Sequence, residues 1–419
     1  MNRVNKAVMI ICLAAVLIVT AIAGARWLTR GQTAAQGNPA APYDLVITIK
    51  QDAATSRAFT WLMGTGDPAL PGVLEVVAGE RAAFTGKDVM RVEAQQSVLQ
   101  TDGGSRGVYK AEAAGLTPGT VYMYRVGSGA DGEWSEPARF STAEQLQDAV
   151  TFINVTDSQG EREADFDLWA RTLDKAFAVF PQAAFIVHNG DLTEDPDNSA
   201  GWSYFFGKAQ NWVSGIPLMP VAGNHEEIDG DATVFASHFN LPDNGADGAT
   251  TGTSYSFDYG PVHVTVLNTE SSRKKQAQWL KEDLAATDRA WKIVAMHRPA
   301  YGGNQYEKVE DWTEIFDEYG VDLVLQGHNH EYSRSYPLLG GRITGREDTI
   351  TGADKGTVYV VTNSSGAKFN EKKDDQFYHK VHFQNHEQMF AGITVSGDAL
   401  TYQAYDASGR KQDEFVIRR

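Results

Sequence analysis

Hydrophobic residues follow two different rhythms along the chain, and the rhythm changes near residue 147. Before that point, short runs of alternating apolar and polar residues are separated by turns rich in Gly, Asp and Pro, as is typical of β-strands. Six strands are predicted, over residues 45–49, 58–62, 73–77, 108–111, 121–126 and 138–140. Together they predict a small β-sandwich.

From about Gln147 onward, buried strands alternate with loops and amphipathic helices, which predicts a domain of mixed α and β structure. Apolar residues recur at helical spacing over residues 165–180, 276–286 and 309–319. Pro181 and Gly320 supply stop signals for the first and last of these helices. Three strands are expected in the tail, over residues 393–395, 400–405 and 415–417, and should close the sheet of this second domain.

The start of the chain has the features of an export segment. Basic residues precede an uncharged apolar run over residues 7–25, and further arginines follow it. Residues 1–30 are therefore predicted to be a signal peptide or an N-terminal membrane anchor, and residues 31–42 a flexible linker. Either reading places the folded part outside the cell or on its surface, with membrane association through the anchor as an open alternative.

The net charge limits the partners of this protein. A formal charge of −17 argues against binding to nucleic acids or to anionic membranes, which needs basic patches. It would also repel an anionic substrate unless bound cations reverse the local field. The sequence gives no indication of an oligomeric state.

Candidate metal ligands follow the predicted strands of the second domain. The loop Gly223-Asn224-His225-Glu226 comes directly after an apolar run over residues 218–221. Four other predicted strands end in the same way, with Asp157, Asp191, His297, and His328 together with His330. Ligands gather beyond the carboxyl ends of strands in open α/β sheets. Oxygen and imidazole donors without sulfur suit Fe, Mn or Zn.

These strand ends carry a family resemblance. The stretches look like the five sequence blocks of the calcineurin-like metallophosphoesterases: Thr156-Asp157-Ser158-Gln159, Gly190-Asp191-Leu192-Thr193-Glu194, Gly223-Asn224-His225-Glu226, Met296-His297-Arg298 and Gly327-His328-Asn329-His330. The preceding sandwich and the Tyr332-Ser333-Arg334 stretch make the chain most similar to the purple acid phosphatase branch. Residues 43–144 also resemble a fibronectin type III domain. The resemblance implies a four-layer αββα sandwich over residues 147–419, preceded by this small all-β domain.

The resemblance further implies a site for two metal ions. Asp191 would bridge both ions, a role that suits the ~3.5–4 Å separation used for in-line phosphoryl displacement. Asp157 and His330 would complete the first site, and Asn224, His297 and His328 the second. His225 would protonate the leaving oxygen, because an imidazole exchanges protons near neutral pH. The expected catalytic residues are therefore His225, Asp191 and Asn224.

The sequence departs from the purple phosphatase pattern at two positions. Glu194 stands where those enzymes carry a metal-binding tyrosine, and Gln159 where many relatives carry histidine. Either residue is a candidate ligand of the first ion or an ordinary loop residue. Without a tyrosine ligand, the protein should lack the purple colour of an iron–tyrosinate pair.

Several further residues border the expected site. Glu226 is a candidate ligand, or a residue that orients His225 or binds backbone amides. Arg298, Tyr306 and Tyr332 are candidate substrate-binding residues, although Arg298 could equally pair with a surface acid. The histidines at 379, 382 and 386 match none of the five blocks and are interpreted as surface or loop residues.

The implied activity is hydrolysis of small phosphate esters, in which hydroxide held by two ions attacks phosphorus and His225 protonates the leaving group. Two alternatives stay open at this point. One is a phosphodiesterase or nucleotide hydrolase on the same scaffold. The other is a surface binding protein whose catalytic site has decayed, which the residues at 159 and 194 suggest.

Overall fold

The computed structural model describes residues 41–64, 71–80, 83–129, 133–228 and 230–419. All of them belong to one unit, Gly37–Arg419. The predicted export segment and nearly all of the linker lie outside the described residues. Within the part of the chain that is described, no helix has the length and apolar character needed to cross a membrane.

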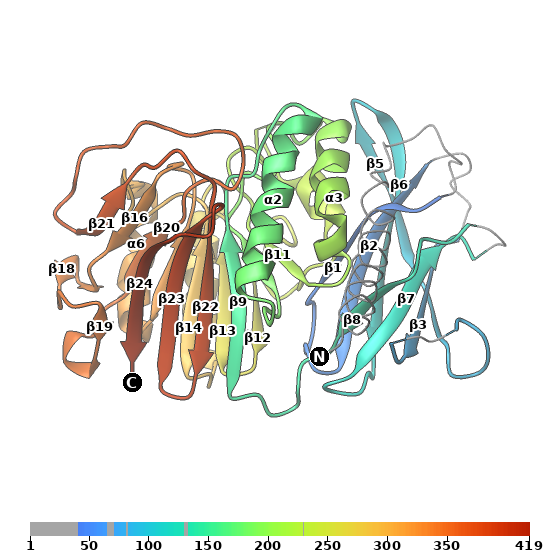
Figure 1. Ribbon diagram of the computed structural model, residues 1–419, viewed down its shortest axis with the longest axis horizontal. Helices are drawn as coiled ribbons and strands as arrows, with labels where there is room; N and C mark the ends of the chain where they lie inside the picture. The colour runs from blue at the N-terminus through green and yellow to red at the C-terminus, as the bar shows by residue number, and fades with distance from the viewer. Residues whose placement is uncertain (1–40, 65–70, 81–82, 130–132, 229) are drawn as a thin grey trace, which may run out of the picture. The chain divides into compact units, whose positions relative to one another are not determined.

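The first domain is a sandwich of two four-stranded antiparallel sheets (Figure 1). One sheet has the order β1 (Tyr43–Thr48), β2 (Ser56–Gly64), β6 (Gly104–Ala114), β5 (Gln95–Thr101), and the other β4 (Met90–Glu93), β3 (Val73–Ala78), β7 (Val121–Gly127), β8 (Ala138–Ser141). Aromatic side chains such as Trp61, Tyr109 and Tyr124 fill the space between them. The six predicted strands are present. β4 and β5 were not predicted, because β5 is mostly polar and exposed.

The second domain contains two seven-stranded sheets. The first has the order β11 (Leu218–Pro220), β10 (Ile186–His188), β9 (Ala149–Val155), β22 (Met389–Ser396), β23 (Ala399–Asp406), β24 (Lys411–Arg418), β19 (Thr349–Ile350). The second has the order β12 (Tyr255–Tyr259), β13 (Val262–Leu267), β14 (Trp291–Met296), β15 (Leu323–Gln326), β20 (Val358–Val361), β16 (Tyr332–Ser335), β21 (His379–Phe383). The prediction that the tail strands close a sheet of this domain is confirmed, since β22 pairs with β9.

Helices cover the outer face of each sheet. The described α-helices of this domain are α2 (Glu163–Val179), α3 (Ser199–Val213), α4 (Thr233–His238), α5 (Arg273–Ala286) and α6 (Glu310–Tyr319). The domain also contains short 3₁₀ turns at Glu307–Val309 and Gly352–Asp354, and a small hairpin formed by β17 (Leu338–Leu339) and β18 (Arg342–Ile343). The apolar faces of α2 and α3 join the core of the first sheet, and those of α5 and α6 pack on the second. The expected four-layer αββα arrangement behind an all-β domain is therefore confirmed.

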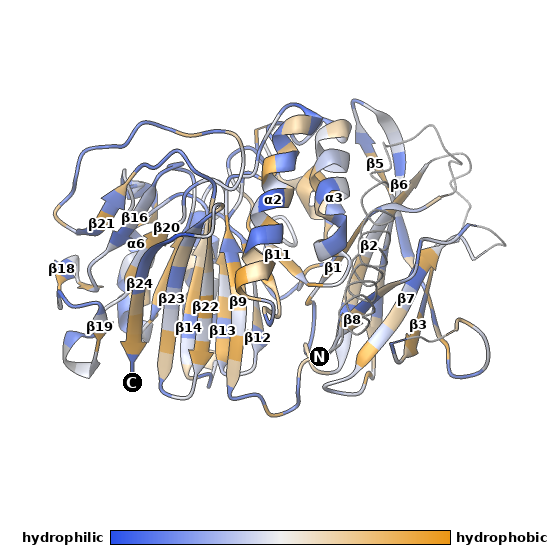
Figure 2. Ribbon diagram, in the orientation of Figure 1, coloured by the Kyte–Doolittle hydropathy of each residue, from blue (hydrophilic) through white to orange (hydrophobic). Residues whose placement is uncertain are grey.

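The helix boundaries have local causes. In α2, Phe166, Trp169 and Leu173 lie on one buried face, and burial of each side chain contributes about 1.5–3 kcal/mol. α6 ends where Gly320 adopts φ 65°, a left-handed conformation that glycine tolerates at little cost. Figure 2 shows the result as alternating hydrophobic and hydrophilic stripes along α2 and α3 over largely hydrophobic strands.

The two sheets face each other, and their parallel strands bring the candidate ligands to one edge. β9, β10 and β11 are mutually parallel, as are β13, β14, β15 and β20. In Figure 1 the red strands β22–β24 lie over the yellow strands β13 and β14. The hydroxyl of Tyr332 in β16 donates to Asp413 in β24, which links the two sheets directly (2.7 Å).

Candidate metal centre

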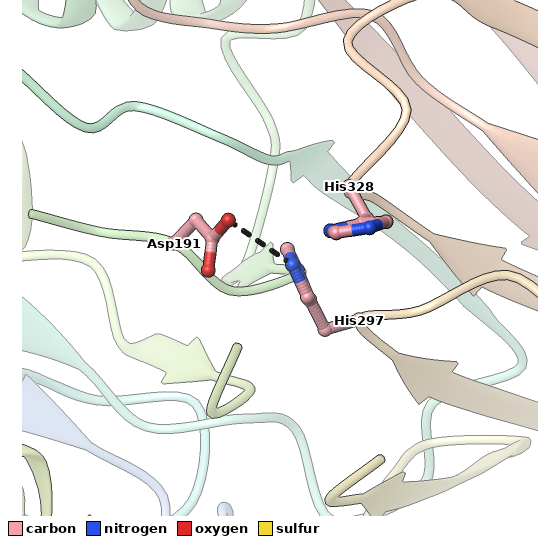
Figure 3. Close-up of side chains that lie close together, drawn as sticks. All are labelled: Asp191, His297 and His328. Carbon is pink, nitrogen blue, oxygen red and sulfur yellow. Dashed lines mark ion pairs between the residues drawn. The ribbon is translucent and has the colours of Figure 1, made fainter. Parts of the chain in front are cut away.

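The loops after β9, β10, β11, β14 and β15 bring the predicted ligands together. Asp191, His297 and His328 form one group whose ligand atoms lie within 4.8 Å of one another, and Asp157, Asp191 and His330 form a second. Asp191 belongs to both groups, and Figure 3 shows it facing His297 and His328. The side chain of Asn224 lies beside the first group, since its Oδ1 is 3.2 Å from His297 Nε2.

The backbone at this edge is held in an unusual conformation. Asp157, Asp191, His328 and His330 have positive φ angles of 53°, 55°, 71° and 51°. Such angles cost of the order of 1–3 kcal/mol in residues other than glycine, and they cluster at functional sites. Gly223 allows the chain to pass close by, because a Cβ there would lie 2.3 Å from Asp191 Oδ1. These four side chains thus point toward the centre from strained backbone conformations.

Glu226 holds the backbone around Asp191. Its carboxylate accepts hydrogen bonds from the amides of Asp191 (2.8 Å), Leu192 (2.8 Å) and Gly223 (2.7 Å), and the side chain is fully buried. Burial, aided by the negative charge of Asp191, raises the pKa of Glu226 to about 7. Because both of its oxygens bind amides, the structure favours the alternative in which Glu226 binds backbone amides over that of a metal ligand.

Two of the histidines have their tautomer fixed by backbone carbonyls. His297 Nδ1 donates to the carbonyl of Asn189 (2.8 Å), and His330 Nδ1 donates to that of Lys368 (2.7 Å). A carbonyl can only accept, so Nε2 of each ring is the nitrogen that faces the centre. His297 Nε2 lies 3.1 Å from Asp191 Oδ2, and His330 Nε2 lies 3.3 Å from Asp157 Oδ1. This is how metal-binding histidines are oriented in proteins.

The charges of the centre depend on each other. Burial alone would lower the pKa of His297, but the carboxylate of Asp191 raises it to about 10. Burial also opposes ionisation of Asp191, yet His297 holds the pKa of that carboxyl well below its usual range. Burial lowers the pKa of His328 to about 3, and the neighbouring positive charges of His297 and Arg298 lower it further. Protons on histidine thus occupy places where a bound cation would balance the same carboxylates.

His225 faces the centre from its rim. Its backbone amide donates to Asp191 Oδ1 (3.0 Å), and its Nδ1 donates to the carbonyl of Glu194 (2.6 Å). The remaining nitrogen, Nε2, lies 3.9 Å from Asp191 Oδ2, and the side chain is 14% exposed. A nitrogen that can exchange a proton therefore lies beside the candidate bridging carboxylate and is within reach of solvent.

The two positions that depart from the family pattern behave differently. Gln159 is buried, and its Nε2 lies 3.2 Å from His330 Nε2 and 3.5 Å from Asp191 Oδ2. Its Oε1 has no hydrogen-bond partner among the described residues. Exchange of the amide nitrogen and oxygen would turn that oxygen toward the ligands. The Glu194 carboxylate instead lies 3.5 Å from Lys368 Nζ, and it belongs to neither ligand group of the centre.

Of the three candidate substrate-binding residues, one departs from the prediction. The prediction for Tyr332 is wrong: the side chain is fully buried between the sheets, because β16 continues directly into the core. Arg298 pairs with Glu270 (2.8 Å), donates to His328 Nε2 (3.0 Å) and stacks on Tyr306. Because Nε2 is taken, Nδ1 of His328 is the nitrogen left for a metal. Arg298 therefore orients the candidate ligand His328, and Tyr306 packs against Arg298.

Two further residues support the centre but were not identified from the sequence. Asn189 donates to the carbonyls of Met296 (3.1 Å) and Leu325 (2.7 Å) and so ties the ends of β14 and β15 to β10. A buried amide directly before the Gly190-Asp191 pair was the available hint. Lys368, which fixes His330 through its carbonyl, carries no local signal, because only tertiary structure brings it there.

Comparison with known proteins agrees with this geometry. Residues 150–332 match the family model described as calcineurin-like phosphoesterase, and residues 42–142 match the purple acid phosphatase N-terminal domain. The fibronectin type III resemblance of the same region stays a prediction. The solved structure of a purple acid phosphatase from yellow lupin seeds aligns with 91% of this chain and 75% of its own, at a TM-score of 0.79 and 20% identity, which establishes a shared fold.

Curated relatives share about a quarter of the aligned positions. An uncharacterised protein of Mycobacterium tuberculosis is 29% identical over 309 residues, which cover 62% of this chain and 58% of the relative. Acid phosphatase type 7 of Mus musculus is 26% identical over 296 residues, covering 62% of this chain and 64% of the relative. The chain thus spans less than two thirds of the length of either protein.

Proposed function

We propose that this chain, which belongs with the calcineurin-like phosphoesterases and carries the N-terminal domain of the purple acid phosphatases, is an exported, metal-dependent hydrolase of small phosphate esters. The main support for the proposal is that Asp191 belongs to both groups of candidate ligands, at the edge where the parallel strands end. The phosphatase named among its relatives supports the same class of reaction.

The residues fit a pair of metal ions. Nε2 of His297 and Nε2 of His330 face carboxylates of the centre, and the buried Gln159 Oε1 lacks a partner among the described residues. Asp191 would serve both ions, Asp157 and His330 the first, and Asn224, His297 and His328 the second. The donors are oxygen and imidazole, so Fe, Mn or Zn suits them. When bound, the ions would supply Lewis-acid activation of water and neutralise phosphate charge.

His225 is the proposed proton donor to the leaving oxygen. The Glu194 carbonyl fixes the proton on Nδ1, so Nε2 is the nitrogen that takes up and gives away a proton. The amide of His225 binds Asp191 Oδ1, which couples the position of the imidazole to that of the bridging carboxylate (3.0 Å). This geometry lets one loop position both a ligand and an acid.

Gln159 is the proposed additional ligand of the first ion, through its flipped amide oxygen. Glu194 is assigned to the ion pair with Lys368 instead. A site without a phenolate ligand should show no tyrosinate charge-transfer band in the visible spectrum. Phosphate monoesters are the proposed substrates, and export through residues 1–30 remains part of the proposal.

One experiment tests the class of function. Metal content of the purified chain is measured together with hydrolysis of an aryl phosphate and of its diester analogue, before and after chelation and metal return. About two ions per chain, with monoesterase activity that is lost and restored with the metal, is the expected result. A chain that binds no metal, or that hydrolyses neither ester when loaded, would contradict the proposal. Preference for the diester would move the function to the phosphodiesterase alternative.

A further inference from the structure

A third group of candidate metal ligands lies outside the five sequence blocks. It comprises Asp375 in the loop before β21 and His379 and His382 within that strand, with one ligand atom of each lying within 4.8 Å of the others. The ring centroids of His379 and His382 are 4.0 Å apart. The group was expected to consist of unrelated surface or loop histidines, so its convergence requires an explanation.

An irregularity in β21 brings the two histidines to the same face. Side chains three residues apart in a regular strand point to opposite faces of the sheet. The pairing of β21 with β16 shifts register: Arg334 pairs with Val381, but Ser335 pairs with His379. The extra residue, Lys380, is what allows His379 and His382 to lie ring against ring. Bulges of this kind re-aim side chains, often beside functional sites.

His382 lies between two carboxylates. Its Nδ1 is 2.8 Å from Asp375 Oδ1, and its Nε2 is 3.3 Å from Glu331 Oε2, but Nε2 makes no hydrogen bond among the described residues. The His382 side chain is 2% exposed and that of Glu331 is fully buried. A neutral imidazole carries one proton and can satisfy only one of these acids. A metal ion on Nδ1 would leave the proton on Nε2, facing Glu331, as metal-bound histidines commonly have it.

We infer that Asp375, His379 and His382 form a separate site for a single transition-metal ion of the Zn²⁺ type, with the buried carboxylate of Glu331 fixing the orientation of His382. Two imidazoles and a carboxylate suit Zn²⁺, and exposure of Asp375 leaves room for water as the fourth ligand. The inference does not depend on the proposed hydrolase activity, because none of these residues belongs to the centre at Asp191.

Besides the contact between His382 and Asp375, two contacts with donors outside the group would change when the ion binds. Lys372 Nζ lies 2.6 Å from Asp375 Oδ1, and the amide of Gln376 donates to His379 Nδ1 (3.0 Å). Both donors are near the surface, so water can replace their partners. The ion would fasten the loop before β21, which reaches the main centre through the amide of Lys373 on Glu331 and the carbonyl of Lys368 on His330.

Zinc binding to the full-length chain tests the site. The protein is stripped with a chelator and titrated with Zn²⁺, and with Co²⁺ as a spectroscopic probe, and the bound ions are counted. Asp375→Asn and His379→Gln change exposed or half-buried side chains, so both variants should fold. Each is expected to bind one ion fewer than the unmodified chain. His386→Gln, an exposed histidine of the same segment, is the matched control and should bind as many ions as the unmodified chain.

Lys372→Ala tests the same site in the opposite direction. Removal of the competing ammonium should tighten this one ion and leave the binding of the others unchanged. Equal ion counts in Asp375→Asn, His379→Gln and the unmodified chain would overturn the inference. A third ion that binds with millimolar or weaker affinity would also overturn it, and so would a third ion whose affinity Lys372→Ala leaves unchanged. Contacts of His382 with Asp375 and Glu331, without a metal ion, would then account for the cluster.

Discussion

Two groups of histidine and aspartate in the same domain differ in the partners of the two ring nitrogens of histidine. In β13, His263 Nδ1 lies 2.8 Å from Asp258 Oδ1 and its Nε2 lies 3.0 Å from Asp283 Oδ2. Asp283 also accepts hydrogen bonds from the hydroxyls of Ser256 (2.6 Å) and Thr265 (2.8 Å). Every nitrogen of this ring has a carboxylate of its own, so the group is closed to further ligands.

The metal centre uses the same residue types with a different arrangement. Backbone carbonyls take Nδ1–H of His297 and of His330, and the other nitrogen of each ring faces a carboxylate within a backbone of positive φ. Residue type alone therefore does not distinguish a structural ion pair from a metal site. The distinguishing features are a ring fixed by a neutral carbonyl and a backbone strained to aim it.

Replacement of the shared carboxylate should separate the two groups most clearly. Asp191→Ala is expected to lose metal and to reduce hydrolysis to background, because both ligand groups contain Asp191. Metal analysis and the aryl phosphate assay on the same sample measure this. Asp283→Ala is the matched control from the closed group: it should lower the melting temperature but keep metal content and activity per folded molecule. Full turnover by metal-free Asp191→Ala would refute the role of the centre.

His225→Gln should reduce kcat by about 10²–10⁴-fold, the usual contribution of a general acid or base, while metal content stays unchanged. The reason is that Nε2, the only free nitrogen of this ring, is lost. The loss should be larger for alkyl than for nitroaryl phosphates, because a poor leaving group needs the proton more. An equal loss for both esters would indicate that His225 only orients Asp191 through its amide.

Glu226→Gln tests the support of the bridging loop. The carboxylate accepts three amide N–H groups, whereas a glutamine would place an NH₂ against at least one of them. Metal affinity is expected to fall about 10–100-fold, as for other residues that orient metal ligands. Glu227→Gln is the neighbouring control, since Glu227 binds Asn268 and Ser271 instead, and it should leave metal affinity unchanged.

Local patterns predicted much of the fold. α2 and α6 were found within two residues because apolar spacing and stop residues agree there. α3 was not predicted, since Gly201 and Gly207 interrupt an aromatic-rich segment whose helical form depends on packing against α2 and β1. Long-range packing decides such elements, and propensity alone does not.

The candidate ligands could be named from the sequence because each follows a predicted strand, and the order of the blocks is specific. The residues that orient these candidate ligands were harder to predict from the sequence. Glu226 and Asn189 act on backbone groups that only the fold brings near, and Lys368 acts through a carbonyl, which any residue type could supply. Tyr332 was predicted at the rim because it lies beside a loop expected to surround the site, but in β16 its side chain is fully buried.

The closed group at His263 should show itself in the pH dependence of stability. Burial alone would lower the pKa of His263, but Asp258 and Asp283 raise it to about 9, above the ~6.5 of an unfolded histidine. The charged ring therefore stabilises the fold fully below about pH 6.5, and this stabilisation is lost as the pH rises through about 9. From the difference in pKa it amounts to about 3 kcal/mol.

His263→Gln should consequently be less stable than the unmodified chain by up to about 3 kcal/mol at pH 6, with the gap narrowing toward pH 9.5. Urea unfolding of both proteins across this range measures the gap, and the difference between the two curves removes the titration of all other groups. His386→Gln, at an exposed position, should give a curve parallel to that of the unmodified chain. A difference in stability that stays constant with pH would mean that His263 is neutral in the fold. The contrast between a charged, closed group at His263 and an open candidate metal centre at Asp191 would then no longer hold.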